Sequence, residues 1–349
     1  MRLGLLAAAR ITGPAVVEPA AMVEGVELTA LAARSPERAA RQATAWGVPV
    51  VHTSYQDLVD DPDLDAIYVA TPAALHHRWT LAALDAGKHV LCEKPLAANA
   101  VEAREMVVAA EAADRLLMEA FHWRYHPLVG RVREVLDDGR LGSIRHVHGS
   151  FCLPDGHVSA DDIRWDLTLG GGALMDLGCY PLQWVRWAVG GEPRVVSAEA
   201  TCPTPDVDGR FGADLVWDDG PTGSIECSMI ADGFDAHLEV VGDHGTLRVT
   251  NPLAPQRGSR IELRLGTGDT GDTGETGGTG DTGAAEVSVP GADTTTYQHQ
   301  LVAFRDAVAS NVHPPTSGAD SVATMELIDA CYRAAGLAPR PSLTSTAGD

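Results

Sequence analysis

Short apolar runs alternate with longer amphipathic segments over the first third of the chain. The apolar runs predict buried strands, and the segments of ten residues or more between them predict helices. Such alternation is typical of βαβ units, whose right-handed crossovers place the strands in one parallel sheet. We therefore expect a doubly wound α/β domain over residues 1–122, with a ligand crevice at the carboxyl ends of its strands. The expected strands are residues 3–6, 27–33, 66–70, 89–92 and 116–119, and the expected helices are residues 36–46, 75–86 and 100–113.

The pattern changes after a predicted helix at residues 126–137. Strand-like segments then follow one another, and Gly242-Asp243-His244-Gly245 predicts a hairpin turn between two of them. We expect an α+β domain over residues 123–340, built on a large, mainly antiparallel open sheet. One face of such a sheet must be covered by its own helices or by another subunit, so we also expect a homo-oligomer, a dimer or a tetramer. The expected strands are residues 144–152, 195–202, 212–217, 223–230, 237–241, 246–250, 261–265 and 286–289.

Composition and charge favour a small molecule as the partner. The formal charge of −22 argues against nucleic acid and anionic membranes, which require a basic surface. The chain has no long uninterrupted apolar run and no recognisable leader, so we expect a cytoplasmic protein. Residues 267–283 are acidic and contain no apolar side chain, which predicts a flexible loop between two strands.

The metal-binding residue types are scattered. The six cysteines form no C-x-x-C pair, which predicts buried free thiols. Two histidine pairs, His122 with His126 and His146 with His148, lack further ligands at a suitable spacing, so we expect no metal site.

Lysine is rare in this chain. Of the 26 lysines and arginines only Lys88 and Lys94 are lysines. A lysine is a compact charge whose pKa responds to burial, which suits it to proton handling in a way that a guanidinium does not.

The turn after the first predicted strand is a candidate phosphate-binding turn. Ala7, Ala9 and Thr12 stand where a dinucleotide-binding fingerprint has glycine or alanine, and alanine resists the positive φ that such a turn uses. In this interpretation the backbone of Ala9, Arg10 and Ile11 contacts the pyrophosphate at a helix N-terminus.

The end of the second strand favours NADP over NAD. NAD-preferring domains place a carboxylate there, whereas Arg34, Ser35 and Arg38 can bind a 2′-phosphate. The alternative is that Arg34 is a solvated loop residue.

Two further strand ends carry polar motifs at the expected ligand edge. Thr71-Pro72 with His76 follows one strand, and Glu93-Lys94-Pro95 follows the next. We expect Thr71, Pro72, His76, Glu93 and Lys94 to line the cofactor site. The peptide bond before Pro95 is a candidate for the cis form.

The chain resembles the Gfo/Idh/MocA family of oxidoreductases, the glucose–fructose oxidoreductase and inositol dehydrogenase group. The likeness rests on Thr71-Pro72 with His76, on AGKHVLCEKP at residues 86–95, and on GGGALMDLGCYPL at residues 170–182. Residues 119–127 and 164–165 look closest to the dimeric dihydrodiol dehydrogenase and NADP-dependent xylose dehydrogenase branch.

The resemblance implies hydride transfer between NADP(H) and a carbon of a sugar or polyol. Lys94 would bond the reacting oxygen, Tyr180 would act as general acid and base, and Asp176 would orient substrate hydroxyls. One helical turn separates Asp176 from Tyr180, so both can face one cleft. Further candidates for the substrate pocket are Tyr125, Arg164 and Trp165.

Two alternatives stay open. A non-catalytic regulatory protein with the same NADP-binding fold would fit the altered phosphate turn, although the lysine, aspartate and tyrosine argue against it. Among enzymes, a sugar dehydrogenase and a biosynthetic keto-sugar reductase would share all these residues.

Overall fold

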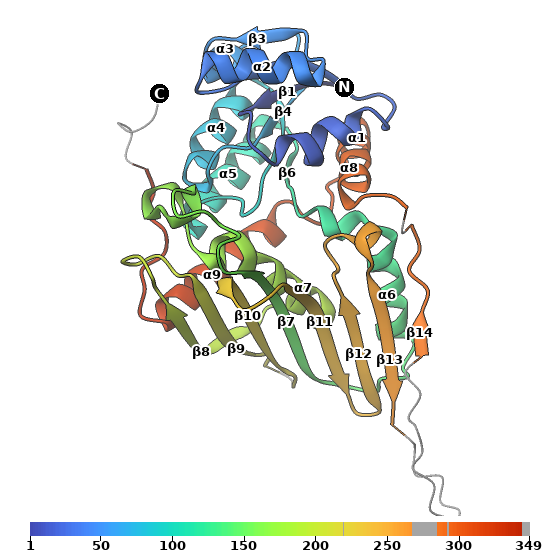
Figure 1. Cartoon of the computed structure of the whole chain (residues 1–349). Helices are drawn as coiled ribbons and strands as arrows, with labels where there is room; N and C mark the ends of the chain where they lie inside the picture. The colour runs from blue at the N-terminus through green and yellow to red at the C-terminus, as the bar shows by residue number, and fades with distance from the viewer. Residues whose placement is uncertain (219, 267–284, 292, 344–349) are drawn as a thin grey trace, which may run out of the picture.

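The structure is a computed structural model, and it describes residues 1–218, 220–266, 285–291 and 293–343. The chain forms two sheets, one above the other in Figure 1, each with helices packed on it. The flexible loop predicted at residues 267–283 lies outside the described residues.

Within the described residues the first sheet has six parallel strands in the order β3-β2-β1-β4-β5-β6. The strand order reverses between β1 and β4, which places a crevice at their carboxyl ends. The predicted doubly wound domain is confirmed, and the short edge strand β3 is an addition that the sequence analysis missed. The strands are β1 (Arg2–Leu6), β2 (Glu27–Ala32), β3 (Val50–His52), β4 (Ala66–Val69), β5 (His89–Cys92) and β6 (Leu117–Glu119).

The helices of this domain begin and end at residues suited to capping. The Ser35 hydroxyl accepts a hydrogen bond from the N–H of Arg38, and Gly47 ends the same helix at φ +69°. Asn99 caps a second helix in the same way as Ser35. The helical segments are η1 (Gly13–Val17), α1 (Glu18–Ala20), α2 (Pro36–Trp46), α3 (Tyr55–Val59), α4 (Ala73–Asp85) and α5 (Ala100–Ala113).

Helix α8 (Thr296–Ser310) returns to the first sheet from late in the chain. Its buried residues Leu301 and Phe304 share a hydrophobic cluster with Leu5 and Met118 of the parallel sheet, and the helix lies beside α1 (Figure 1). The start of α8 therefore lies where the two sheets meet.

As far as the chain is described, the second sheet has eight strands in the order β14-β13-β12-β11-β7-β10-β9-β8. All neighbours pair antiparallel except β7 and β10, so the mainly antiparallel sheet is confirmed. The predicted hairpin turn connects β11 and β12. The strands are β7 (Ile144–Pro154), β8 (Arg194–Thr201), β9 (Arg210–Val216), β10 (Thr222–Ala231), β11 (Asp235–Gly242), β12 (Gly245–Thr250), β13 (Arg260–Leu265) and β14 (Ala285–Val287).

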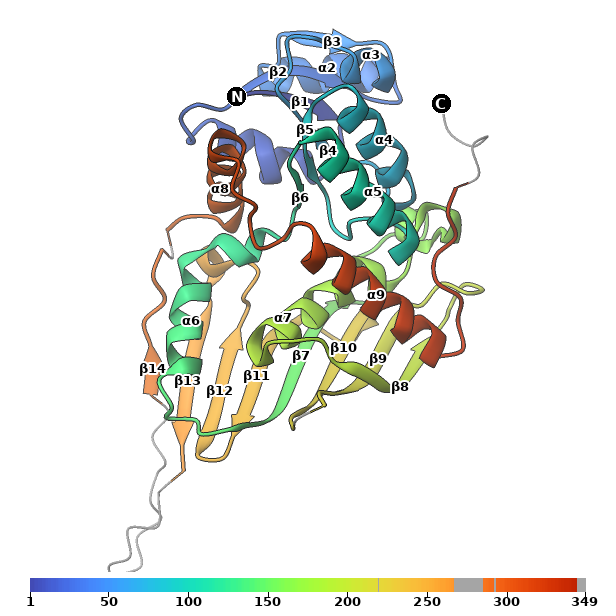
Figure 2. The ribbon, with the colours of Figure 1, turned by 180° about the vertical axis from the view of Figure 1, so that it is seen from behind.

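Within the described residues, helices cover one face of the second sheet (Figure 2). These are α6 (Pro127–Asp137), α7 (Cys179–Val189) and α9 (Ala319–Ala334). Gly149 of β7 faces α7 so closely that a Cβ there would lie 2.8 Å from Pro181. On the opposite face His148 pairs with Ser224 of β10 and Glu239 of β11, which makes that face polar. In the described part of the chain no helix is long and apolar enough to cross a membrane.

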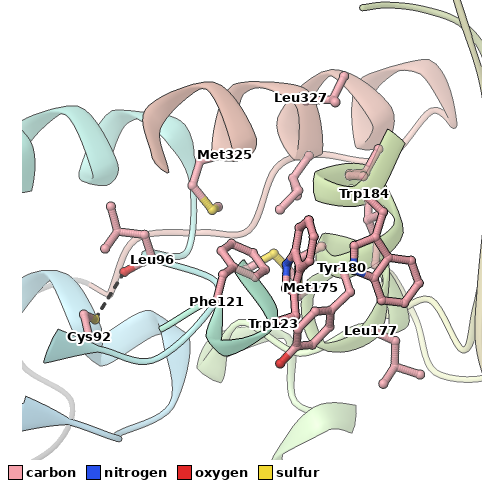
Figure 3. Packing of buried hydrophobic residues seen from close by; sticks show 14 of the residues in the cluster. Cys92, Leu96, Phe121, Trp123, Met175, Leu177, Tyr180, Trp184, Met325 and Leu327 are labelled. Carbon is pink, nitrogen blue, oxygen red and sulfur yellow. Dashed lines mark hydrogen bonds between the residues drawn. The ribbon is translucent and has the colours of Figure 1, made fainter. Parts of the chain in front are cut away.

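A continuous hydrophobic cluster joins the two sheets beneath the crevice. Leu96 and Phe121 from the first domain lie near Met175 and Tyr180 from the second, and Met325 of α9 packs beside them (Figure 3). All five are at most 5% exposed. Burial of such a side chain contributes about 1.5–3 kcal/mol, so this cluster holds the two domains in a fixed relation.

Candidate active site

The turn after β1 has the backbone shape that a dinucleotide requires. Ala7 adopts φ +94°, and its N–H donates to the carbonyl of Ala32 at 3.0 Å. The buried Thr12 hydroxyl donates to the carbonyl of Ala7 at 3.2 Å, and the helical hydrogen bonds begin with Ala15 N–H to the carbonyl of Ile11. An L-residue in this conformation costs about 1–2 kcal/mol. The turn therefore forms although alanine stands in place of glycine.

Thr71, at the end of β4, carries an unused hydrogen-bonding group. Its hydroxyl oxygen is buried and has no hydrogen-bond partner among the described residues. Leaving a buried polar group unpaired costs about 1–3 kcal/mol, so this oxygen is available for a ligand. Together with the turn at Ala7 it fits a dinucleotide, with backbone N–H groups for the phosphates and a hydroxyl at the neighbouring strand end.

The predicted 2′-phosphate residues lie together at the start of α2. Arg34 and Arg38 are exposed, and the Ser35 hydroxyl donates to the carboxylate of Glu37 at 2.8 Å. Glu37 was not among the residues predicted at this strand end. Since Ser35 is engaged by the helix N-terminus, the two guanidinium groups are the cations that this strand end presents.

His76 connects two loops at the carboxyl edge of the sheet. Its Nδ1 lies 3.0 Å from the carbonyl oxygen of Pro95 and its Nε2 lies 2.8 Å from that of Thr71. Burial lowers the pKa of His76, and a neutral imidazole can donate to only one of these acceptors. In this structure His76 holds the loop after β4 against the loop after β5. Direct contact between His76 and a cofactor stays a prediction.

The Glu93-Lys94-Pro95 segment leaves β5 at the crevice, and the peptide bond between Lys94 and Pro95 is cis, the form that the sequence allowed. The Tyr68 hydroxyl donates to Glu93 at 2.7 Å, and the Lys94 N–H donates to the other oxygen of the same carboxylate at 3.3 Å. Burial raises the pKa of the Glu93 carboxyl. The backbone of Lys94 is thereby fixed at the edge of the parallel sheet.

The side chain of Lys94 crosses to the second domain. Its ammonium donates to the carboxylate of Asp176 at 3.0 Å and to the backbone carbonyl of Asp176 at 2.6 Å, and it lies 5.1 Å from the ring centroid of Tyr180. Asp176 belongs to the short helical segment η5 (Leu174–Gly178), and Tyr180 lies in the first turn of α7. The three residues that the sequence analysis grouped do lie together.

Charge neutralisation keeps this cluster ionised. Burial opposes the Asp176 carboxylate, but the charges of Lys94 and Arg164 outweigh it and hold the pKa of Asp176 well below its usual range. The Arg164 Nε donates to the second oxygen of that carboxylate at 2.6 Å. Burial alone would lower the pKa of Lys94, but Asp176 raises it. Lys94 is therefore a fixed ammonium group.

The ion pairs continue outward to the phosphate turn. Arg164 also donates to Asp162 at 3.0 Å, and the exposed Arg10 pairs with the same aspartate at 3.4 Å. Trp165 lines a surface hollow formed by residues 160–162 and 165–167 together with 204, 205 and 207. Arg164 thus connects the Lys94 cluster to the phosphate turn, whereas the hollow beside Trp165 is lined only by residues of the second domain.

The third substrate-pocket candidate has a different environment. The Tyr125 hydroxyl bonds that of Thr316 at 2.6 Å, and its ring packs against the hydrophobic cluster of the parallel sheet. Tyr125 thus belongs to the packing between α8 and the parallel sheet rather than to the Lys94 cluster.

Tyr180 has a buried partner that the sequence analysis did not assign to the site. The His122 Nε2 lies 3.0 Å from the Tyr180 hydroxyl, and the His122 Nδ1 lies 2.7 Å from the hydroxyl of Thr296. His122 had been considered only as a possible metal ligand. Nothing in its spacing points to Tyr180, because the two residues lie 58 positions apart on different elements.

Three glycines allow the chain to approach this cluster. A Cβ at Gly171 would lie 2.5 Å from the carbonyl oxygen of Arg164. Gly172 has φ +131°, and a Cβ there would lie 2.3 Å from the Asp208 carboxylate. Gly170 has φ +82°. The glycine run at residues 170–172 is thus required by conformation and by space immediately before Asp176.

Two buried charged residues hold the same segment from behind. Asp208 accepts from the N–H of Leu174 at 2.7 Å, and Arg340 donates to the carbonyl of Gly171 at 2.6 Å. Asp208 and Arg340 also form an ion pair in which both side chains are fully buried. Sequence reasoning missed both, because they lie in irregular segments 132 residues apart.

Comparison with known proteins assigns the chain to a family. A model described as "Oxidoreductase family, NAD-binding Rossmann fold" matches residues 2–121, and one described as "GFO/IDH/MocA C-terminal domain" matches residues 129–248. Similar proteins include D-xylose 1-dehydrogenase (NADP(+)) 2 of Haloferax volcanii, which is 35% identical over 96% of this chain and 97% of its own length. Trans-1,2-dihydrobenzene-1,2-diol dehydrogenase of Bos taurus is 36% identical over 65% of this chain and 67% of its own.

A solved structure shows the same architecture. A 3-ketoreductase from Actinomadura kijaniata, in complex with NADP and TDP-benzene, superposes with a TM-score of 0.84 at 30% identity, over 95% of this chain and 96% of that one. The fold, the two family matches and the relatives agree. The chain belongs to the Gfo/Idh/MocA family of oxidoreductases.

Proposed function

We propose that this chain transfers a hydride between NADP(H) and a carbon of a sugar or polyol, with Lys94 and Tyr180 handling the proton. The observation that supports it most is the meeting of Lys94, Asp176 and Tyr180 at the carboxyl edge of the parallel sheet. The relatives named as a xylose dehydrogenase and a 3-ketoreductase, both with NADP in their descriptions, support the choice of cofactor and substrate class.

The contacts of the three residues support the roles that the family resemblance implies. Bound nicotinamide supplies the carbon that gives or takes the hydride. The Lys94 ammonium, held by Asp176, donates to the reacting oxygen and stabilises negative charge that develops there. Tyr180, whose pKa burial raises well above its usual value, exchanges the proton as a neutral phenol.

The 2′-phosphate of NADP is assigned to the exposed arginines at the start of α2. Arg34 and Arg38 flank the N-terminus of that helix, where backbone N–H groups add to their charge. The carboxylate of Glu37 is turned to the Ser35 hydroxyl. The arrangement supports NADP, with NAD as the weaker ligand.

The regulatory alternative loses its main support. It rested on the missing glycines of the phosphate turn, and Ala7 nevertheless adopts the positive φ of such a turn. The structure offers no feature that favours a sugar dehydrogenase over a keto-sugar reductase, so the proposal covers both directions.

Two measurements in sequence test the proposal. Titration followed by NADPH fluorescence gives the affinity for NADPH and, by competition, for NADH. Turnover is then measured with NADP⁺ and a panel of aldoses and polyols that begins with D-xylose, and with NADPH and keto sugars. We expect tighter binding of NADPH and turnover of at least one member. Tight NADPH binding with no turnover across the panel would instead favour a regulatory protein.

A further inference from the structure

We infer that His122 acts through Tyr180 as the terminal acceptor of a two-step proton relay, so that Tyr180 passes its proton on instead of forming a phenolate. This inference rests on the proposed function, since it concerns the proton of the same reaction. Its basis is a buried row of hydrogen bonds that runs from Tyr180 through His122 to the start of α8.

The direction of the hydrogen bonds follows from one hydroxyl. The Thr296 hydroxyl has a single proton, and it donates that proton to the carbonyl of Leu253 at 3.2 Å. Thr296 can therefore only accept from His122, which places a proton on Nδ1. The Nε2 of a neutral His122 then carries a lone pair, and the Tyr180 hydroxyl donates to it.

This direction leaves the lone pairs of the Tyr180 oxygen free for a substrate. A substrate hydroxyl can donate to the Tyr180 oxygen while the proton of Tyr180 already points to Nε2. In oxidation the carbon loses its hydride to the cofactor, the hydroxyl proton passes to Tyr180, and the proton of Tyr180 passes to His122. The products are the carbonyl, the reduced cofactor, a neutral phenol and a protonated His122, so charge and protons balance.

Burial disfavours a phenolate at Tyr180, which favours the two-step route over phenolate formation. Tyr180 is 5% exposed and His122 is 4% exposed, and burial raises the pKa of the phenol well above its usual value. Burial and the Lys94 charge lower the pKa of His122 to about 3. His122 is therefore neutral before turnover, and because its low pKa disfavours the protonated form, it holds the proton only transiently and returns it through Tyr180 when the carbonyl product leaves.

The surroundings fix both rings. Tyr297 of α8 packs against His122 at a tilt of 36° with ring centroids 4.1 Å apart, and Phe121 meets Tyr180 edge-on at 5.5 Å. Thr296 is fully buried. The titratable and charged groups that act on the pair are Lys94, Glu93, Asp176, Cys179 and Tyr297.

The test compares pH profiles of sugar oxidation. The probe is D-xylose with NADP⁺ or, if D-xylose is not oxidised, the panel member that the wild type oxidises fastest. Because neutral His122 is the acceptor, wild-type kcat/KM should stay flat from about pH 6 to about pH 9. His122→Phe must use the phenolate, so its kcat/KM should start at least about a hundredfold lower and rise about tenfold per pH unit.

A second variant distinguishes proton transfer to His122 from a purely structural role of the His122 side chain. His122→Gln can accept a hydrogen bond from Tyr180 but cannot take its proton at neutral pH, so it should show the same rising profile. The matched control is His126→Asn. His126 is another buried histidine of the same segment, and its ring caps the start of α6. This control should keep the flat profile. A flat profile in His122→Gln would overturn the relay, as would unchanged profiles in both His122 variants.

A second readout needs no substrate. Nitrogen-15 NMR of histidine-labelled protein, with His122 assigned by the loss of its signals in His122→Phe, reports which ring nitrogen carries the proton. The relay requires protonated Nδ1 and an accepting Nε2, and a protonated Nε2 would contradict it. A wild type that oxidises no member of the panel would refute the proposed function alone. The tautomer of His122 would still show in which direction the hydrogen bonds between Tyr180, His122 and Thr296 run.

Discussion

The two lysines of this chain have different tasks. Lys88 donates to the backbone carbonyls of Asp61 and Leu64 at 2.7 and 2.8 Å, a structural role at the far end of the parallel sheet. Lys94 instead donates to Asp176 beside Tyr180. The rarity of lysine predicted a special role for either residue, and the contacts separate them.

Replacing Lys94 tests whether its ammonium group takes part in catalysis. Lys94→Ala should lower kcat by about a hundredfold to ten-thousandfold, because the reacting oxygen loses its cationic donor. NADPH binding, measured by fluorescence, should stay within about tenfold. Lys88→Ala is the matched control, and it should lower thermal stability while leaving kcat near the wild-type value. Unchanged turnover in Lys94→Ala would remove this lysine from the mechanism.

Replacing Arg34 tests the cofactor assignment. Arg34→Asp puts a negative charge beside the proposed 2′-phosphate, so the preference for NADPH over NADH should fall by about tenfold or more. Competitive titration with the two cofactors measures the ratio. Arg41→Asp changes the same charge farther along α2 and should leave the ratio near that of the wild type. If both variants behave alike, the phosphate binds elsewhere.

At the scale of elements, the segment before α7 is held by close contacts on both sides. The carbonyl oxygen of Arg164 contacts it in front, and Asp208 and Arg340 contact it behind. The sequence predicted the importance of the glycine run through a family likeness. It could not predict the contacts, because they come from loops whose paths no local pattern determines.

Gly172→Ala should therefore be severely destabilising. The new Cβ would meet the Asp208 carboxylate at 2.3 Å, and that carboxylate is fixed by its ion pair. The expected loss in the free energy of unfolding is about 3 kcal/mol or more, measured by urea denaturation. Gly47→Ala is the control, because Gly47 also has positive φ, in the left-handed region, but no neighbour within 4 Å. The control should lose only about 1–2 kcal/mol of unfolding free energy. Equal losses in the two variants would show that the contact with Asp208 is not what destabilises Gly172→Ala.

A buried carboxyl beside the loop after β5 makes the stability of the fold depend on pH. Glu119 of β6 accepts from the N–H of Leu96 at 2.8 Å, and burial raises its pKa from about 4.5 to about 8. A carboxyl with a raised folded-state pKa stabilises the fold fully below about pH 4.5, and that contribution is lost as the pH rises through about 8. Between these values the ionisation of Glu119 should lower the free energy of unfolding by roughly 1.4 kcal/mol per pH unit.

Glu119→Gln isolates this contribution, because the amide imitates the neutral carboxyl. Thermal unfolding is compared between about pH 5 and about pH 8 for wild type and variant. We expect the melting temperature of the variant to fall less over this range. Parallel curves would mean that Glu119 is ionised throughout.

At the scale of the whole molecule, the sequence predicted the two sheets better than their junction. Alternating apolar runs indicated the parallel sheet, and the later strands indicated the antiparallel one. The return of α8 to the first sheet was not predictable, because its Leu301 and Phe304 would suit any apolar surface. The sequence showed Lys94, Asp176 and Tyr180 but missed His122, because His122 and Tyr180 lie 58 positions apart and no local pattern brings them together.

The association of subunits, which was expected from the second sheet, stays a prediction. Its own helices cover one face (Figure 2), and the other presents polar residues such as His148 and Glu239. A polar face does not itself require a partner. The homo-oligomer expected from the sequence therefore still depends on a mass measurement in solution.

The central claim is that Lys94 and Tyr180 converge beside a bound nicotinamide. A crystal structure of the protein with NADP⁺ tests it most directly. The account predicts the nicotinamide ring in the crevice at the ends of β1 and β4, with room for one substrate oxygen about 3 Å from both the Lys94 ammonium and the Tyr180 hydroxyl. A nicotinamide bound away from these groups, or a crevice too closed to admit it, would contradict the account.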